Sequence, residues 1–190
     1  MQESHIVTSP QKGPHDNLEK IVTKHMATPY QKPYQQHNLE AFRVFEKILE
    51  QKGSKQLILD SCCGTGLSSY QLALANPDAL VIGIDQSEKR LSKETHHLHE
   101  TPDNCVYYRA NCEDFWRLCV QAGISFEKHF ILYPNPYPKT PHIKRRWHGH
   151  PVFPVLKELS NAIEVRSNWK LYIEEFAIAW QLATHTQGAI

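Results

Sequence analysis

Two apolar runs that each end in an aspartate constrain the fold of this chain most strongly. Residues 57–59 (LIL) lead into Asp60, and residues 80–84 (LVIGI) lead into Asp85. Between them lie a glycine turn at residues 64–66 (GTG) and a stretch with helical character. This order predicts a strand–turn–helix–strand unit whose parallel strands carry their acids at one edge of a sheet. Ligands of such sheets bind outside the carboxyl ends of the strands, so we expect the functional site there.

The rest of the chain continues the alternation of strands and helices. The lead-in is rich in Pro, Gln and His, with one helical piece expected around residues 17–25. The pattern of apolar residues predicts strands at residues 56–60, 79–85, 105–110, 128–133 and 162–167, and helices at residues 39–52, 67–75, 87–99, 113–122, 152–159 and 171–183. We therefore predict an α/β fold, a three-layer Rossmann-like sheet, with residues 1–38 as an irregular N-terminal extension and residues 39–190 as one domain.

Composition places the chain among ordinary globular domains. A net charge of +1 does not by itself indicate a nucleic-acid partner. Five cysteines form an odd set, and two of them are adjacent, so a disulfide framework is not expected and a reducing, cytoplasmic location is. No apolar run approaches the length of a membrane span, and the polar N-terminus lacks the core of a signal peptide.

The glycine turn and its two acids indicate a nucleoside-bearing ligand. Asp85 lies 19 residues beyond Gly66, where a carboxylate can accept hydrogen bonds from both ribose hydroxyls. A dinucleotide site favours a third glycine where this chain has Ser69. The acid just before the turn, Asp60, suits a cation, and the sulfonium and ammonium groups of S-adenosylmethionine fit that description. The alternative is a tight turn that binds nothing. The adjacent cysteines lack the C-x-x-C spacing of a zinc site, so we predict no metal.

A proline-rich loop and a basic segment follow the fourth expected strand. Three prolines in residues 133–139 (YPNPYPK) stiffen the loop and hold Asn135 and Tyr137 in position, as a reaction governed by geometry requires. Residues 140–148 (TPHIKRRWH) then offer cations next to an aromatic side chain, which suits a phosphate backbone and a stacked base. The alternative is a solvated charged loop.

These segments together resemble a known family. YPNPYPKTPHIKRR is similar to the signature of the tRNA (guanine-N7)-methyltransferases, roughly F-P-D-P-W-P-K-K-R-H-x-K-R-R. Residues 30–33 (YQKP), the turn at residues 60–66, Asp85, residues 111–113 (NCE) and residues 167–169 (SNW) fall in the expected order. The resemblance covers roughly residues 10 to 180 and implies a class I methyltransferase that uses S-adenosylmethionine and acts on tRNA, as a monomer or a homodimer.

The resemblance also implies roles for single residues. The implied cofactor-binding residues are Asp60, Cys62, Gly64, Gly66, Asp85, Gln86, Asn111 and Cys112. Catalytic positions fall on Asn135 and Tyr137. The implied substrate-binding residues are Lys139, His142, Lys144, Arg145, Arg146 and Asn168.

The chain departs from the family pattern at several of these positions. Cys62 stands at the first glycine of the turn, and Tyr137 stands at the tryptophan of the loop. Asn135 and Asn168 replace two aspartates on the substrate side. A late T-x-x-E motif and two final strands are not found before Ile190, so we expect a sheet that lacks them and ends at the fifth strand.

Two other functions remain open from the sequence. The Asn135-Pro136-Tyr137 triplet resembles the N-P-P-Y loop of enzymes that methylate exocyclic amines, although the aromatic residue comes one position early. The two aspartate-to-asparagine changes also fit a catalytically weak module that binds S-adenosylmethionine and RNA.

Overall fold

The computed structural model describes residues 7–53, 56–92, 100–160 and 162–189. The chain forms two compact units. One, here called the sheet unit, comprises Pro33–Leu132 and Glu158–Glu164. The other, here called the helical unit, comprises Met1–Lys32, Tyr133–Lys157 and Val165–Ile190. The division predicted from the sequence, at residue 38, stays a prediction.

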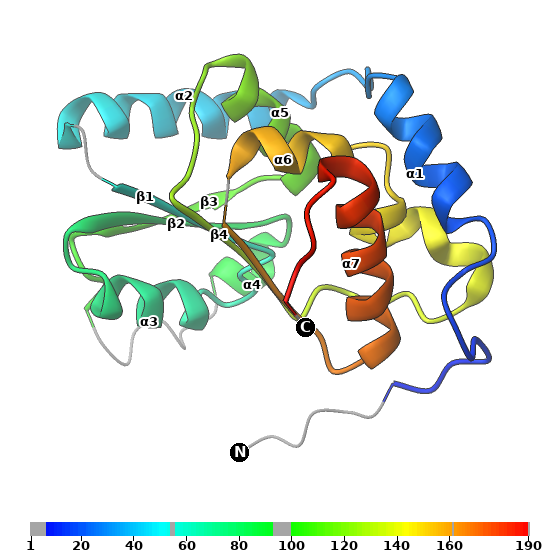
Figure 1. Ribbon diagram of the computed structural model, residues 1–190. Coiled ribbons are helices and arrows are strands. Elements are labelled where there is room, and N and C mark those ends of the chain that lie inside the picture. The colour runs from blue at the N-terminus through cyan, green and yellow to red at the C-terminus, as the bar shows by residue number, and fades with distance from the viewer. Residues whose placement is uncertain (1–6, 54–55, 93–99, 161, 190) are drawn as a thin grey trace. The chain divides into compact units, whose positions relative to one another are not determined.

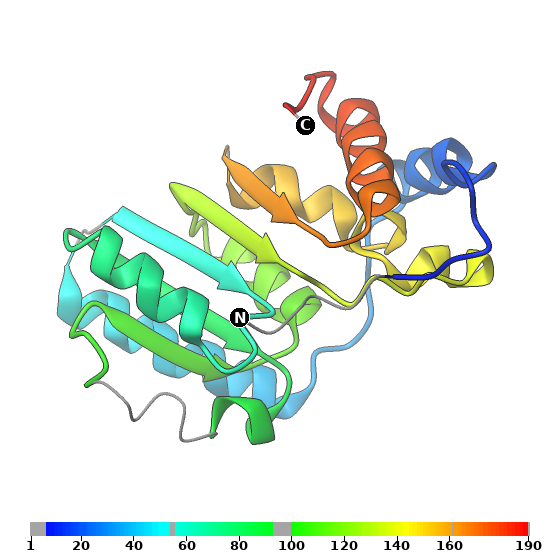
Figure 2. The same cartoon turned by 90° about the horizontal axis from the view of Figure 1, so that it is seen from below.

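A five-stranded sheet has the strand order β3-β2-β1-β4-β5 (Figure 2). The strands are β1 (Gln56–Ser61), β2 (Ala79–Asp85), β3 (Cys105–Arg109), β4 (Lys128–Leu132) and β5 (Ile163–Arg166). The pairs β1–β2, β1–β4 and β2–β3 are parallel. The hydrogen bonds from β4 to β5, His129 to Ala162 and Tyr133 to Arg166, keep one offset of 33 residues, so β5 is parallel too. Each strand lies within two residues of its prediction at either end.

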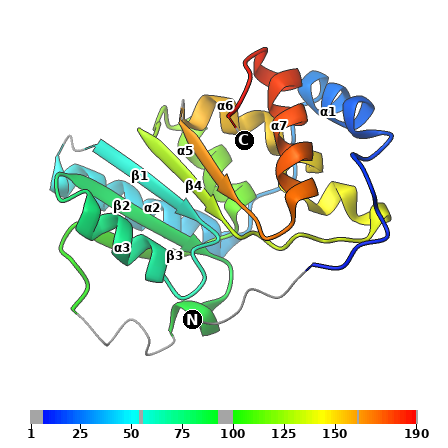
Figure 3. The same cartoon turned by 60° about the horizontal axis from the view of Figure 1, so that its bottom comes forward.

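Helices cover both faces of the sheet in the sheet unit. Helices α2 (Gln36–Lys52) and α5 (Cys112–Gln121) lie on one face, and α3 (Leu67–Ala75) lies on the other, with the short α4 (Glu88–Leu91) after β2 (Figures 1 and 3). This three-layer arrangement confirms the predicted α/β class. Phe45 of α2 packs on Phe115 of α5 with ring centroids 5.2 Å apart, and both rings are fully buried.

The helical unit contains α1 (Leu18–Ala27), which packs against α7 (Lys170–Thr184). Three short 3-10 helices, η2 (Thr140–Arg145), η3 (Trp147–Gly149) and η4 (Phe153–Val155), follow the proline-rich loop. The last continues into α6 (Leu156–Leu159).

Two helix predictions differ from the structure. The helix expected at residues 152–159 divides into η4 and α6, because Pro154 has no amide hydrogen for a regular first turn. Of the helix expected at residues 87–99, only α4 is present in the described part, where it is capped by Ser87, and residues 93–99 lie outside the described residues. Helix α2 begins three residues before the predicted start at Leu39 and ends at Lys52, before Gly53, whose positive φ of 71° favours glycine.

Candidate functional site

Asp60, near the end of β1, is a fully buried carboxylate that is only half satisfied. Its Oδ2 accepts hydrogen bonds from the hydroxyls of Ser68 and Ser69, each at 2.6 Å. Its Oδ1 is buried and has no hydrogen-bond partner among the described residues. Burial raises the pKa of Asp60, and the two serine hydroxyls oppose that shift. A buried carboxylate oxygen without a donor is costly, so this atom suits a ligand that brings a cationic donor.

The turn after Asp60 bends through three left-handed residues. The φ angles are 61° at Cys62, 62° at Gly64 and 80° at Gly66. The two glycines accept this conformation easily, whereas Cys62 pays roughly 1–2 kcal/mol for it. A Cβ atom added to Gly64 would meet nothing within 4 Å, so open space adjoins the backbone there. The turn therefore leaves room for a ligand to approach the main chain.

Asp85, the last residue of β2, is also buried, but its carboxylate is already occupied. Oδ2 accepts a hydrogen bond from the Gly64 amide at 3.0 Å, and Oδ1 accepts one from the Ser87 amide at 2.8 Å. Arg90 forms an ion pair with Oδ1 at 3.1 Å. The carboxylate thus fastens the glycine turn to the end of β2. It can accept hydrogen bonds from two ribose hydroxyls only if Arg90 or the Gly64 amide is released. Gln86, next along the chain, is exposed.

The end of β3 contributes Asn111 and Cys112. Asn111 caps α5, and its side chain is held by α2, because its Oδ1 lies 3.3 Å from Asn38 Nδ2 and 3.1 Å from His37 Nε2. The Asn111 amide donates to Asn38 Oδ1 at 2.9 Å. The sulfur of Cys112 lies 3.6 Å from the sulfur of Cys62, so the first turn of α5 touches the glycine turn directly. The structure therefore gathers predicted residues from three strand ends at the carboxyl edge of the sheet.

Several residues that support this edge were not predicted. Ser68 and Ser69 hold Asp60, Ser87 holds Asp85, and Asn38 holds Asn111. The sequence could have indicated burial of Asn38, because this polar residue lies on the same helical stripe as the predicted apolar positions of α2. The structure buries Asn38 fully.

The proline-rich loop presents its predicted catalytic residues at the surface of the helical unit. Asn135 is exposed, and its Oδ1 accepts the Tyr137 amide at 3.2 Å, which closes a small turn. Tyr133 and Tyr137 both have positive φ, 52° and 43°. The Arg145 guanidinium lies 4.9 Å from the Tyr137 ring centroid. Among the predicted substrate-binding residues, those that are exposed are Lys139, Lys144, Arg145 and Asn168, and His142 is half-buried beside Tyr137.

Arg146, the last cation of the predicted RNA-binding run, lies in the interior of the helical unit. Its Nη1 forms an ion pair with Glu175 at 2.5 Å, and both side chains are completely buried. Its other nitrogens donate to Gln11 Oε1 at 3.0 Å and to the Tyr137 carbonyl at 3.2 Å. The guanidinium also lies 4.7 Å from the Trp169 ring centroid. The structure therefore differs from the exposed phosphate contact expected of Arg146, because an ion pair sequesters its charge.

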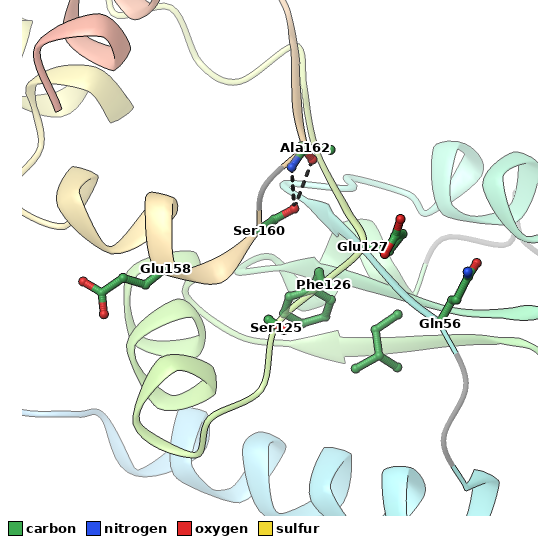
Figure 4. A pocket seen from close by; sticks show the side chains of 8 residues that line it. Gln56, Ser125, Phe126, Glu127, Glu158, Ser160 and Ala162 are labelled. Carbon is green, nitrogen blue, oxygen red and sulfur yellow. Dashed lines mark hydrogen bonds between the residues drawn. The ribbon is translucent and has the colours of Figure 1, made fainter. Parts of the chain in front are cut away.

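A pocket of about 410 Å³ opens at the opposite edge of the sheet, near the amino ends of β1 and β4 (Figure 4). It is lined by Gln56, Leu57, Ser125, Phe126, Glu127, Glu158, Ser160 and Ala162. None of the predicted cofactor-binding residues lines it. The carboxyl edge with its unsatisfied Asp60 therefore remains the candidate site.

Two classes of feature are not found in the described residues. The described residues contain no group of three or more His, Cys, Asp or Glu side chains placed to hold a metal ion. No helix among them has the length and apolar character needed to cross a bilayer.

Comparison with known proteins identifies the family. The model of the Methyltransf_4 family, which carries the description "Putative methyltransferase", matches residues 54–184, more than half of the chain. The chain belongs to this methyltransferase family. The match includes the glycine turn, both strand-end acids and the proline-rich loop, which are among the segments that carried the predicted resemblance.

One curated relative is the tRNA (guanine-N(7)-)-methyltransferase of Mycoplasma genitalium, 34% identical over 94 residues. The match covers 48% of this chain and 44% of the relative, so the chain spans less than half the length of that protein. A crystal structure of the aminoglycoside resistance methyltransferase NpmB1 and a solved structure of an antibiotic-related methyltransferase are similar in fold. Their TM-scores are 0.51 and 0.52, with 20% and 14% identity. These alignments cover 74% and 80% of this chain, and 70% and 76% of the respective structures.

Proposed function

We propose that this chain binds S-adenosylmethionine at the carboxyl edge of its sheet and transfers the methyl group to guanine N7 in tRNA, in the cytoplasm. The observation that carries the cofactor part is the buried Oδ1 of Asp60, which lacks a donor among the described residues. Membership of a methyltransferase family and similarity to a tRNA (guanine-N(7)-)-methyltransferase support the reaction and the substrate.

The residues of the sheet unit fit the proposed cofactor in charge and in shape. Asp60 Oδ1 would accept a hydrogen bond from the cofactor's ammonium group, and the favourable charge pairing would lower the pKa that burial raises. The open space beside Gly64 would admit the cofactor against the backbone. Asp85 would hold the ribose and Asn111 would adjoin the adenine. When bound, S-adenosylmethionine supplies an electrophilic methyl group on a sulfonium.

The residues of the helical unit fit a nucleic-acid substrate. Exposed Lys139, Lys144 and Arg145 would contact phosphates, which position an RNA without reading its sequence. Asn135 would orient the base through hydrogen bonds, and the Tyr137 ring would stack on it. Along the chain, the loop begins at Tyr133, directly after β4, which pairs with β1.

The chemistry of guanine N7 matches this set of residues. N7 carries a lone pair and no proton, so methyl transfer needs no general base. Catalysis then depends mainly on holding the nucleophile in line with the methyl group, an effect that can lower the barrier by roughly 7–11 kcal/mol. The methylated base is cationic, and Asn135 cannot stabilise it as a carboxylate would. We therefore expect cofactor binding to be well preserved and turnover to be slow.

Isothermal calorimetry with S-adenosylmethionine tests the cofactor site. Asp60→Asn removes the charge but keeps the shape, so the affinity should fall about 10- to 100-fold, the equivalent of one hydrogen bond to a charged group. Asp78→Asn is the matched control, because Asp78 is an exposed acid in the turn before β2, and its affinity should equal that of the wild type. Equal affinity in the wild type and Asp60→Asn would contradict the assignment.

Nucleoside mass spectrometry of bulk tRNA, after incubation with the protein and S-adenosylmethionine, tests the reaction. The proposal expects 7-methylguanosine. An N-methylated exocyclic amine would instead support the alternative suggested by the Asn135-Pro136-Tyr137 triplet. Cofactor binding without any methylated nucleoside would support a catalytically weak module that binds RNA.

A further inference from the structure

Two thiols meet at the carboxyl edge of the sheet. Cys62 in the glycine turn and Cys112 in the first turn of α5 have sulfur atoms 3.6 Å apart, although 50 residues separate them in the sequence. Cys112 is buried, and Cys62 is partly exposed. All five cysteines lie in the described part of the chain, and among those residues this is the one pair of sulfur atoms within hydrogen-bond distance.

The backbone conformation at Cys62 is unfavourable for a residue with a side chain. Its φ of 61° is the left-handed conformation that favours glycine. A cysteine costs roughly 1–2 kcal/mol there. Strain of this kind persists where the surrounding structure holds it and often marks a functional position.

From this pair we infer that Cys62 and Cys112 form a reversible disulfide that closes the carboxyl edge of the sheet to a nucleoside. The bridge would join the turn after β1 to the helix after β3. Strand β2 lies between those strands, and its Asp85 carries the Gly64 contact just beside the pair. In the reduced protein a weak S–H···S contact lets the two sulfurs part. A covalent bond of about 2.05 Å fixes them together.

A hydroperoxide supplies the oxidising equivalent. The Cys62 thiolate attacks one oxygen of hydrogen peroxide and becomes a sulfenic acid, while the other oxygen leaves as hydroxide and takes up a proton to form water. The Cys112 sulfur then displaces the sulfenic hydroxyl, which leaves as water with the Cys112 proton. Two thiols and one peroxide thus give one disulfide and two waters. Cys62 is the residue oxidised first, because it is the more exposed of the two and because the hydrogen bond with Cys62 and burial raise the pKa of Cys112.

Peptide mapping without reductant tests the bond itself. After peroxide treatment, trypsin should release residues 110–117, which contain Cys112 alone, cross-linked to the peptide that carries Cys62 and Cys63. Cys62→Gly should abolish the cross-link and suits the backbone at that position. Cys63→Ala is the matched control and should keep it. A wild type without the cross-link, or a cross-link that survives in Cys62→Gly, would overturn the inference.

Calorimetry tests the consequence for binding, and this part depends on the proposed function. S-adenosylmethionine should bind the oxidised wild type about tenfold more weakly or worse, and dithiothreitol should restore the affinity. By reciprocity, the cofactor should shift the equilibrium away from the cross-linked form. Cross-linked protein with unchanged affinity would refute the closure. A reduced protein that does not bind the cofactor would count against the proposed function, while the peptide map alone would still decide whether the thiols pair.

Discussion

Adjacent arginines at 145 and 146 should respond in opposite ways to the same substitution. Arg146 is fully buried and holds Glu175, Gln11 and the Tyr137 carbonyl, whereas Arg145 is exposed above the Tyr137 ring. Replacing either with methionine keeps an unbranched apolar stem and removes the guanidinium. We expect Arg146→Met to lower the free energy of unfolding and to leave RNA contact directly unaffected. We expect Arg145→Met to weaken RNA contact and to leave the free energy of unfolding nearly unchanged.

The magnitude for Arg146→Met follows from what its removal leaves behind. Breaking a buried ion pair costs about 3–5 kcal/mol, because the remaining charge stays desolvated. Glu175 keeps donors from Gln11 at 2.6 Å, the His15 amide at 2.9 Å and His148 at 2.9 Å, which favours the lower end of that range. A loss of about 3 kcal/mol should lower the melting temperature by about 6–12 °C for a chain of this size. Arg145→Met should change the free energy of unfolding by less than about 0.5 kcal/mol.

Thermal melts followed by circular dichroism, and tRNA binding titrated against salt, measure the two effects. Loss of one phosphate contact lowers the slope of log affinity against log salt by about 0.7–0.9. Arg145→Met should show that change, and Arg146→Met, assayed below its melting temperature, should keep the wild-type slope. The reasoning is refuted if Arg146→Met melts with the wild type and flattens the salt dependence.

Three further changes test other parts of the fold. Burial lowers the pKa of His129 to about 3, so the unfolded chain takes up a proton at a higher pH than the folded chain does. The free energy of unfolding should therefore fall as the pH drops from 6.5 toward 3. In chemical denaturation, His129→Gln should reduce the slope of the free energy of unfolding against pH by about 1.4 kcal/mol per pH unit in this range. Cys62→Gly relieves the left-handed strain but raises the conformational entropy of the unfolded chain. The free energy of unfolding, measured by urea denaturation, should therefore change by no more than about 1 kcal/mol. A Cβ at Gly83 would lie 2.5 Å from Ser69 Oγ, which donates a hydrogen bond to Asp60, so Gly83→Ala should displace that hydroxyl. Calorimetry should then show weaker S-adenosylmethionine binding, and full affinity would refute a role of Ser69 in holding Asp60 for the cofactor.

The sequence predicted the sheet closely because its strands are short apolar runs that end in clear turns. All seven residues of β2 are buried, and a run with that composition has few alternatives to a central parallel strand. The glycine turn was equally readable, because Gly64 and Gly66 adopt the positive φ angles that make glycine informative. Local pattern and tertiary structure agree at these positions.

The basic segment shows where local reading fails. Residues 144–146 (KRR) look alike in sequence, yet the third is buried while the others are exposed. The partners that draw Arg146 inside are Glu175, 29 residues later, and Gln11, 135 residues earlier. A run of cations predicts a charged surface, and only the packed fold decides which member is used for an interior ion pair.

The two strand-end acids illustrate the same limit within the candidate site, and they change how the site is best tested. Asp60 and Asp85 appear equivalent in the sequence, but Asp85 already binds two amides and Arg90, while Asp60 has a buried oxygen with no donor among the described residues. Removing Asp85 would also free the Gly64 amide and loosen the turn, so a loss of binding in Asp85→Ala would not separate a ribose contact from a disturbed backbone. Asp60→Asn leaves both serine hydroxyls an oxygen to bond and changes mainly the charge. The substitution at Asp60 therefore isolates the electrostatic contribution on which capture of a cationic nucleoside depends.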